Sequence, residues 1–176
     1  EGGFDGNDTD GVDLSTRTGT SLVEEQDEII MSKLLAGVDV TEVYSPERVT
    51  KVCKKMLLKP RCAYDLQTGW DFSRADHRSM ALQRIRDEQP MLLVGSPPCT
   101  MFSITQNLNI HKHGDKDEWK DKFEQRKSQA IRHIKFCAFL YRMQVSQGRY
   151  LLHEHPHGAT SWDLEVIKKL ERMVGV

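Results

Sequence analysis

The chain has 176 residues, of which 38% are hydrophobic and 29% are charged, and this length gives room for a single domain with its own core. Its four cysteines show no paired spacing, which excludes a disulfide framework and indicates a reducing compartment. No stretch approaches the ~18 consecutive apolar residues of a membrane span, and no signal segment opens the chain. The sequence therefore predicts an intracellular protein, nuclear or cytoplasmic, without membrane contact.

The net charge of −1 hides an uneven distribution along the chain. Residues 1–28 carry nine acidic side chains and one basic, so residues 29–176 carry 24 Lys and Arg against 17 Asp and Glu. Residues 1–21 are rich in Gly, Asp, Thr and Ser, a composition that predicts a disordered acidic linker. Residues 22–176 form the predicted domain, which we expect to continue beyond Val176, and their positive excess is typical of a polyanion binder and also of ordinary surfaces.

Apolar residues after the linker recur with the periods of strands and helices. Short apolar or alternating runs predict strands over residues 38–44, 62–66, 91–94 and 150–152. Amphipathic patterns predict helices over residues 22–35, 48–58, 73–89, 119–145 and 164–174. The segment between the third strand and about Asp117 is polar and predicts a loop. Strands that alternate with helices imply an α/β fold with a parallel, doubly wound sheet.

The loop after the third strand, Gly95-Ser96-Pro97-Pro98-Cys99-Thr100-Met101-Phe102-Ser103, is the most informative segment. In a parallel sheet, ligands bind beyond the carboxyl ends of the strands. Pro97 and Pro98 fix their own φ angles, so they hold Cys99 on a stiff segment. A cysteine in this position is a candidate nucleophile, whereas the usual role of a single cysteine is that of a small buried hydrophobe.

Two segments carry a resemblance to a known family. Pro97-Pro98-Cys99 followed by Phe102-Ser103 resembles the catalytic loop of the DNA cytosine-5 methyltransferases, and Arg149–His155 resembles their next strand with its Glu-Asn-Val motif. The resemblance implies a Rossmann-like domain that uses S-adenosylmethionine and acts on DNA, with RNA left open. The Ser-Pro-Pro-Cys and His-Glu-His-Pro segments also resemble parts of mobile-element polyproteins, which implies further domains in the same polypeptide.

The resemblance gives chemical roles to two residues. Cys99 would add as a thiolate to C6 of cytosine and raise the nucleophilicity of C5. Glu154, which aligns with the carboxylate of the family motif, would donate a hydrogen bond in its protonated form to N3 of the flipped base. We therefore expect Glu154 to be partly buried and the two strand ends to converge, whereas a surface carboxylate is the alternative.

The resemblance also implies a cofactor site at the ends of the first two strands and beside the cysteine loop. The residues expected to bind S-adenosylmethionine are Glu42, Ser45, Asp65, Trp70, Asp71 and Pro97. Asp65 lies at the end of the second strand and would accept hydrogen bonds from ribose hydroxyls, and Ser45 is also the predicted N-cap of the next helix. The turn from Tyr44 to Arg48 contains no glycine, so a degenerate copy that binds no cofactor stays open.

Basic residues follow the cysteine loop. Ser103, Lys112 and Lys116 are the candidate nucleic-acid contacts, because phosphates need such a basic run. A solvated helix face, with ion pairs to neighbouring Asp and Glu, explains the same lysines. A non-catalytic nucleic-acid-binding or scaffold module is therefore the alternative to the enzyme.

A rival prediction comes from the histidines near the last strand. His153, His155 and His157 share one face of an extended segment and could ligate zinc in a metal-dependent hydrolase. Pro156 interrupts that strand, and no Cys or carboxylate is spaced as a fourth ligand. We therefore predict no metal site.

Overall fold

Four parallel strands form a sheet in the part of the chain that the structure describes. The structure, a computed structural model, describes residues 37–173, so the linker predicted over 1–21 and the helix predicted over 22–35 lie outside the described residues. The strands are β1 (Val40–Val43), β2 (Pro60–Tyr64), β3 (Leu92–Gly95) and β4 (Tyr150–His153). Their order is β2-β1-β3-β4, and every neighbouring pair is parallel. The predicted α/β fold with a parallel sheet is confirmed.

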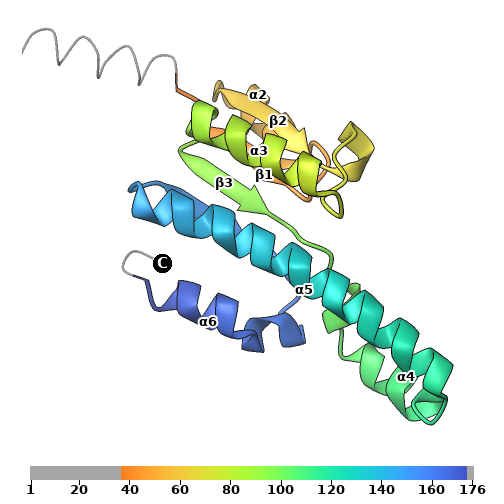
Figure 1. Cartoon of the computed structure of the whole chain (residues 1–176). Helices are drawn as coiled ribbons and strands as arrows, with labels where there is room; N and C mark the ends of the chain where they lie inside the picture. Colours follow the sequence, from red (N-terminus) through yellow and green to blue (C-terminus); the bar gives the residue numbers. More distant parts are fainter. Residues whose placement is uncertain (1–36, 174–176) are drawn as a thin grey trace, which may run out of the picture. The chain divides into compact units, whose positions relative to one another are not determined.

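Five α-helices connect or follow these strands (Figure 1). They are α2 (Val49–Lys55), α3 (Ala75–Glu88), α4 (Thr105–His113), α5 (Asp117–Ser146) and α6 (Glu165–Glu171). Three single turns of 3₁₀-helix are η1 (Leu66–Thr68), η2 (Thr100–Phe102) and η3 (Thr160–Asp163). Figure 1 shows α4 beside the beginning of α5, away from the sheet.

Side chains alternate between the two faces of the sheet, and each face has its own cover. Val40 and Val94 pack with Cys53 of α2 on one face. Val43 and Leu93 point to the other face, where α3 and α5 supply most of the larger buried cluster. Helices therefore cover both faces, as expected for a parallel sheet that is buried on both sides.

Gly95, the last residue of β3, lets α5 approach the sheet closely. A Cβ atom at this position would lie 2.0 Å from the hydroxyl oxygen of Tyr141. That hydroxyl donates a hydrogen bond to the Gly95 carbonyl at 3.1 Å. Any side chain here would therefore push α5 away from the carboxyl edge of the sheet, where the candidate site lies.

Two sequence predictions need correction. The predicted polar loop before Asp117 contains a helix, α4, none of whose residues is buried. Because its side chains remain in solvent, its sequence lacks the apolar stripe that predicts a helix. The second strand ends at Tyr64 and not at Leu66, although Asp65 still follows it directly.

Candidate functional site

The connection from β1 to α2 is organised around the carboxylate of Glu42. This side chain is fully buried and accepts hydrogen bonds from the amides of Arg48, Val49 and Thr50 at 3.2, 2.8 and 3.0 Å. The hydroxyls of Thr50 and Ser45 also donate to it, at 2.6 and 3.3 Å. The first amides of a helix lack partners within the helix, and a carboxylate satisfies them. Glu42 therefore caps α2, so the predicted contact of its carboxylate with a cofactor has no geometric support.

Ser45 and Tyr44 complete the same turn. Ser45 is buried, and its hydroxyl donates to Glu42 and to the carbonyl of Pro46, so its predicted role as helix N-cap is wrong: the N-cap residue is Arg48. Tyr44 has a left-handed φ of 59°, which costs a non-glycine residue about 1–2 kcal/mol. The turn without glycine thus reaches a backbone conformation that usually requires one.

A cavity of about 460 Å³ lies at the carboxyl ends of β1, β2 and β3. We call it the strand-end cavity, and its volume suits a small-molecule ligand. It is lined by Tyr44, Asp65, Leu66, Trp70, Asp71, Phe72, Ser73, Ser96, Pro98, Gln129 and His133. Three of the predicted cofactor residues, Asp65, Trp70 and Asp71, are therefore brought together, whereas Glu42, Ser45 and Pro97 are not among the lining residues.

Aromatic rings form one wall of the strand-end cavity. Tyr44 contacts Phe72 with ring centroids 4.7 Å apart, and its hydroxyl is hydrogen-bonded to Nδ1 of His133 at 3.0 Å. Burial raises the pKa of Tyr44 and lowers the pKa of His133, so both groups are neutral at pH 7. The guanidinium of Arg84 lies 5.1 Å from the ring centroid of Trp70, a cation–π arrangement that orients this indole.

The two carboxylates of the strand-end cavity are held by local hydrogen bonds. Asp65 accepts from the amide of Gln67 at 2.9 Å and caps η1. Asp71 accepts from the hydroxyl and the amide of Ser73 at 2.6 and 2.9 Å. These bonds lower the pKa of Asp71. Asp71 is therefore an anion at neutral pH, and it gives the cavity affinity for hydroxyl donors and for positive charge.

Cys99 lies at the end of the stiff segment that leaves β3. Pro97 is buried, Pro98 is exposed, and Cys99 is partly exposed as the N-cap residue of η2. Phe102, in the same short turn, is fully buried, and the ammonium of Lys127 lies 4.4 Å from its ring centroid. Lys127 also donates to the carbonyl of Met101 at 2.9 Å. The cysteine is thus anchored on both sides while its own side chain stays accessible.

His155 fastens the cysteine loop to the segment after β4. Its Nε2 lies 3.1 Å from the carbonyl of Pro97, and its Nδ1 is hydrogen-bonded to the hydroxyl of Ser161. A carbonyl can only accept, so Nε2 carries the proton and Nδ1 accepts from Ser161. Burial lowers the pKa of His155, which keeps this neutral tautomer. The predicted convergence of the two strand ends is thus confirmed, and the sequence prediction had missed this role of His155.

Glu154 and Cys99 follow neighbouring strands at the same edge of the sheet. Gly95 pairs with His153, and the amide of Glu154 donates to the Gly95 carbonyl at 2.9 Å. The side chain of Glu154 is exposed, so the prediction of partial burial is wrong. The reason is that side chains alternate between the faces of β4, and Glu154 follows Leu152 on the face that α5 does not cover.

Among the described residues, His153, the last residue of β4, is hydrogen-bonded to a protein group through one ring nitrogen only. Tyr141 donates to the Gly95 carbonyl, so its oxygen accepts from Nδ1 of His153 at 3.0 Å. The other nitrogen, Nε2, is buried and has no partner among residues 37–173. Burial, with a smaller contribution from His155, lowers the pKa of His153 to about 4. Within the described range, no group of three His, Cys, Asp or Glu side chains is placed to hold a metal ion.

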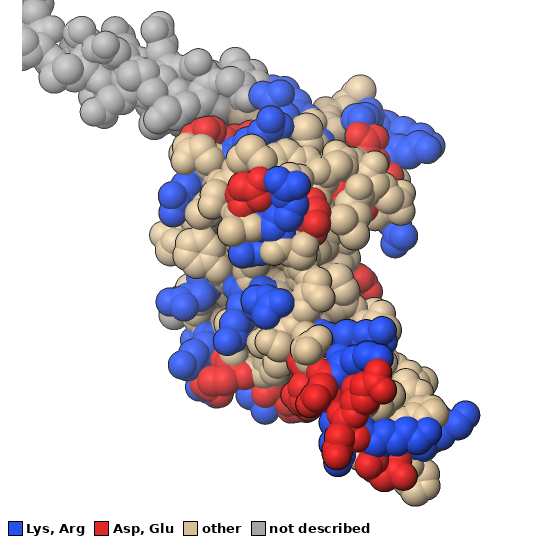
Figure 2. All heavy atoms as spheres, turned by 45° about the vertical axis from the view of Figure 1, so that its right-hand side comes forward, with Lys and Arg blue, Asp and Glu red and all other residues tan. Residues whose placement is uncertain are grey.

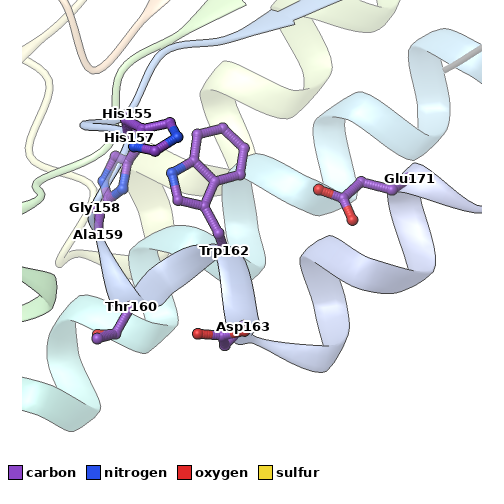
Figure 3. Close-up of a pocket in the computed structure, with 8 residues that line it drawn as sticks. All are labelled: His155, His157, Gly158, Ala159, Thr160, Trp162, Asp163 and Glu171. Atoms are coloured by element: carbon purple, nitrogen blue, oxygen red, sulfur yellow. The ribbon is translucent and has the colours of Figure 1, made fainter.

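A second cavity, of about 620 Å³, lies beyond these histidines. It is lined by His155, His157, Gly158, Ala159, Thr160, Trp162, Asp163 and Glu171. Figure 3 shows the indole of Trp162 between the two histidine rings and Glu171. Neither Cys99 nor Glu154 lines this cavity or the strand-end cavity, but only the strand-end cavity is lined by residues of the cysteine loop, Ser96 and Pro98.

The predicted nucleic-acid contacts lie on η2, α4 and the start of α5. Ser103 is partly exposed and its hydroxyl is hydrogen-bonded to Thr105, whereas Lys112 and Lys116 are exposed. Residues 105–128 carry six Lys and Arg and five Asp and Glu. Figure 2 shows both signs of charge mixed over this part of the surface. A continuous basic patch is therefore not found there.

Comparisons with known proteins found no protein similar to this chain. The chain matches no protein-family model, no curated protein and no solved structure. Among the described residues, no helix combines the length and the apolar character that a membrane span requires.

Sequence reasoning missed several residues of the strand-end cavity. Tyr44, Ser96 and Pro98 could have been found, because Tyr44 ends the first predicted strand and the other two follow the third, all at the carboxyl edge. Gln129 and His133 gave no such signal, since α5 reaches the cavity only through the packing of the whole helix on the sheet.

Proposed function

We propose that this chain is an S-adenosylmethionine-dependent methyltransferase-like domain that acts on cytosine in DNA, with Cys99 as the nucleophile. The observation that carries the proposal is the position of the strand-end cavity. It opens at the ends of three parallel strands, and Ser96 and Pro98 of the cysteine loop form part of its wall. A ligand in this cavity lies beside the segment that holds Cys99.

The sheet topology supports a Rossmann-like arrangement. β1 and β3 are neighbours, and the chain leaves them toward opposite faces, to α2 in one case and to α5 in the other. Such a switch point opens a crevice at the carboxyl edge, which is where ligands of doubly wound sheets bind. The strand-end cavity occupies this position.

The turn after β1 favours a cofactor that has no phosphate. In dinucleotide-binding folds, a pyrophosphate binds the free amides at the start of the first helix. Here Glu42 occupies those amides, so a phosphate would meet a buried carboxylate. S-adenosylmethionine has a positive sulfonium, ribose hydroxyls and an adenine ring. Asp65, Asp71 and the aromatic wall suit these groups.

The residues of the chain divide the chemistry as follows. The Cys99 thiolate forms a bond to C6 of cytosine, and the electron pair of the C5–C6 double bond becomes available at C5. The cofactor, when bound, would supply the methyl group that C5 accepts, and its sulfonium would become a neutral thioether. A water molecule takes the proton from C5, the electron pair of that C–H bond restores the C5–C6 double bond, and the bond between Sγ and C6 breaks with its electron pair on sulfur, so the Cys99 thiolate is regenerated. Glu154 holds N3 of the base through this sequence.

A non-catalytic nucleic-acid-binding or scaffold module is the second candidate. Two observations favour it: the Tyr44 side chain, fixed to His133, lines the strand-end cavity, and Glu154 is exposed. Such a module would keep the fold and lose cofactor affinity.

Calorimetric titration of S-adenosylmethionine into the full chain tests the proposal. The variant is Asp65→Asn, which keeps the oxygen that accepts from the Gln67 amide and removes the charge. Asp87→Asn, on the exposed surface of α3, is the matched control. We expect micromolar binding that falls at least ~10-fold in Asp65→Asn and is unchanged in Asp87→Asn.

Covalent trapping tests the chemical step separately. An oligonucleotide with 5-fluorocytosine cannot lose a proton from C5, so the Cys99 adduct would persist and be visible by mass spectrometry. Cys99→Ser should form none. A folded protein that binds no S-adenosylmethionine and forms no adduct would overturn the proposal in favour of the binding module.

A further inference from the structure

A third cavity, of about 310 Å³, lies between α4 and the beginning of α5. We call it the hairpin cavity. It is lined by Thr100, Met101, Gln106, Asn109, Trp119, Lys122, Phe123 and Arg126. Thr100 and Met101 directly follow Cys99 in the chain, so this cavity adjoins the cysteine loop on the side that η2 leads to.

Aromatic rings provide a flat surface in the hairpin cavity. Trp119 and Phe123 lie one turn apart on α5, with ring centroids 4.9 Å apart and planes inclined by only 23°. His113, at the end of α4, continues the series, with its ring centroid 6.1 Å from that of Trp119. All three side chains are partly exposed. Partly exposed aromatic rings that line a cavity are a platform on which a nucleic-acid base can stack, whatever the base.

Amide groups line the other side of the cavity. Asn109 donates to the side-chain oxygen of Gln106 at 3.1 Å, and Gln106 donates to the carbonyl of Thr100 at 2.9 Å. This chain of bonds leaves the amide oxygen of Asn109 without a partner in the described part of the molecule. An oriented carboxamide beside a stacking platform can pair with the edge of a base.

Two cations complete the lining. Lys122 is paired with Glu118, whereas Arg126 is exposed and has no ion-pair or hydrogen-bond partner within residues 37–173. A guanidinium in this position can bind a phosphate through two parallel hydrogen bonds. The surrounding surface carries both signs of charge, so the cation that matters is Arg126, which lines the cavity with Trp119 and Phe123 and has no acidic partner in the described residues.

The hairpin cavity is held in register with Cys99. Gln106 and Lys127 bind the carbonyls of Thr100 and Met101, the two residues that follow the cysteine. The position of the hairpin cavity relative to Cys99 is therefore fixed, and so is the position of any ligand that fills it.

We infer that the hairpin cavity binds an unpaired nucleotide of the same strand that carries the target cytosine. The base stacks on Trp119 and Phe123, Asn109 contacts its edge, and Arg126 binds the adjacent phosphate. An acidic peptide would use the cations but would leave the ring faces unused. The inference deepens the proposed function and rests on it, because the cysteine loop is what brings the strand to this place.

Fluorescence anisotropy with a labelled single-stranded oligonucleotide of twelve nucleotides and one cytosine tests the inference on the full chain. The variants are Phe123→Leu and Arg126→Gln. Each has a matched control on the exposed surface of α5 outside the cavity, Phe139→Leu and Lys135→Gln. We expect each cavity variant to weaken binding about 10-fold and each control to change it less than about 2-fold.

Three outcomes would overturn the inference. Equal weakening by Arg126→Gln and Lys135→Gln would mean diffuse electrostatic attraction without a site. No effect of Phe123→Leu would remove the stacking platform. Displacement of the oligonucleotide by poly-glutamate as effectively as by unlabelled oligonucleotide would assign the cavity to an acidic peptide.

The two proposals fail in different ways. Asp65→Asn should weaken S-adenosylmethionine binding at least ~10-fold and leave the anisotropy titration unchanged, whereas Arg126→Gln should weaken oligonucleotide binding about 10-fold and leave S-adenosylmethionine binding unchanged. Because Arg126 is exposed, its replacement does not endanger folding, and thermal melts check that Phe123→Leu remains folded. If both cavity variants bind the oligonucleotide normally and S-adenosylmethionine binding is intact, the nucleotide site in the hairpin cavity is refuted. The proposed function then still stands.

Discussion

The turns after β1 and β3 leave neighbouring strands at the same edge of the sheet, yet they are built in opposite ways. The turn after β1 closes around Glu42, whose carboxylate is buried and receives five hydrogen bonds. The turn after β3 has two prolines and a partly exposed cysteine, and side chains from outside the turn, such as His155 and Lys127, bind its carbonyls. In the first turn the polar groups hydrogen-bond to one another, whereas in the second turn the reactive thiol stays accessible.

The polar groups of the site therefore have two different roles: some stabilise the fold, and others are available to a ligand or for reaction. A buried carboxylate that satisfies helix amides stabilises the fold but cannot serve a ligand. A thiol on a proline-stiffened segment adds little to stability and is available for reaction. Substitutions in the two turns should therefore have opposite consequences, which the following experiments test from the largest effect to the smallest.

Glu42→Gln is expected to have the largest effect on stability. The substitution turns one acceptor oxygen into a donor that faces helix amides, so the free energy of unfolding should fall by about 3 kcal/mol. Cys99→Ser, in the other turn, should change it by less than about 1 kcal/mol. Urea denaturation followed by circular dichroism measures both. Glu47→Gln, an exposed residue paired only with Lys54, is the control and should have little effect. Similar losses for Glu42→Gln and Cys99→Ser would erase the contrast between the turns.

The pH dependence of the stability should depend on His153, at the end of β4. His153 has a folded-state pKa of about 4, below its ordinary value of 6.5, because protonation would leave a charged Nε2 buried without an acceptor. The unfolded chain therefore binds a proton more readily, and stability present above pH 6.5 is lost as the pH falls toward 4. Thermal melts between pH 7 and pH 4.5 should show a fall in Tm that is smaller by roughly 3–6 °C in His153→Asn. Asparagine retains a group near the position of Nδ1 for Tyr141. An identical fall in both proteins would assign the acid sensitivity to other groups, such as His133 and His155, whose pKa values are also lowered.

The same contrast explains what sequence could and could not predict. The strands and the long helix α5 were found because apolar periodicity marks buried elements, and the second strand was displaced by two residues because its start is exposed. Asp65 was found because it lies at a strand end, and Trp70 and Asp71 were named from the resemblance to the methyltransferases. α4 was missed since nothing in it is buried.

The roles of Glu42 and His155 depend on contacts that no local pattern encodes. Glu42 binds amides six to eight residues later in the chain, and its place in an apolar strand gives no sign of that partner. His155 binds a carbonyl 58 residues earlier. Such contacts exist only after the parallel strands have been placed side by side.

Tyr44→Phe is expected to have the smallest effect on the free energy of unfolding. It tests whether the Tyr44 hydroxyl helps to hold the turn after β1. It removes the hydrogen bond to His133 but keeps the ring that packs on Phe72, so the free energy of unfolding should fall by only about 0.5–1 kcal/mol. Tyr150→Phe, whose side chain is 65% exposed, is the matched control and should be neutral in the same urea titration. If Glu42 holds the left-handed backbone of Tyr44, as its five hydrogen bonds imply, the hydroxyl of Tyr44 is not needed for it. A fall in the free energy of unfolding of more than about 2 kcal/mol would instead mean that the contact with His133 fixes the turn. The side chains that line this wall of the strand-end cavity would then stabilise the fold.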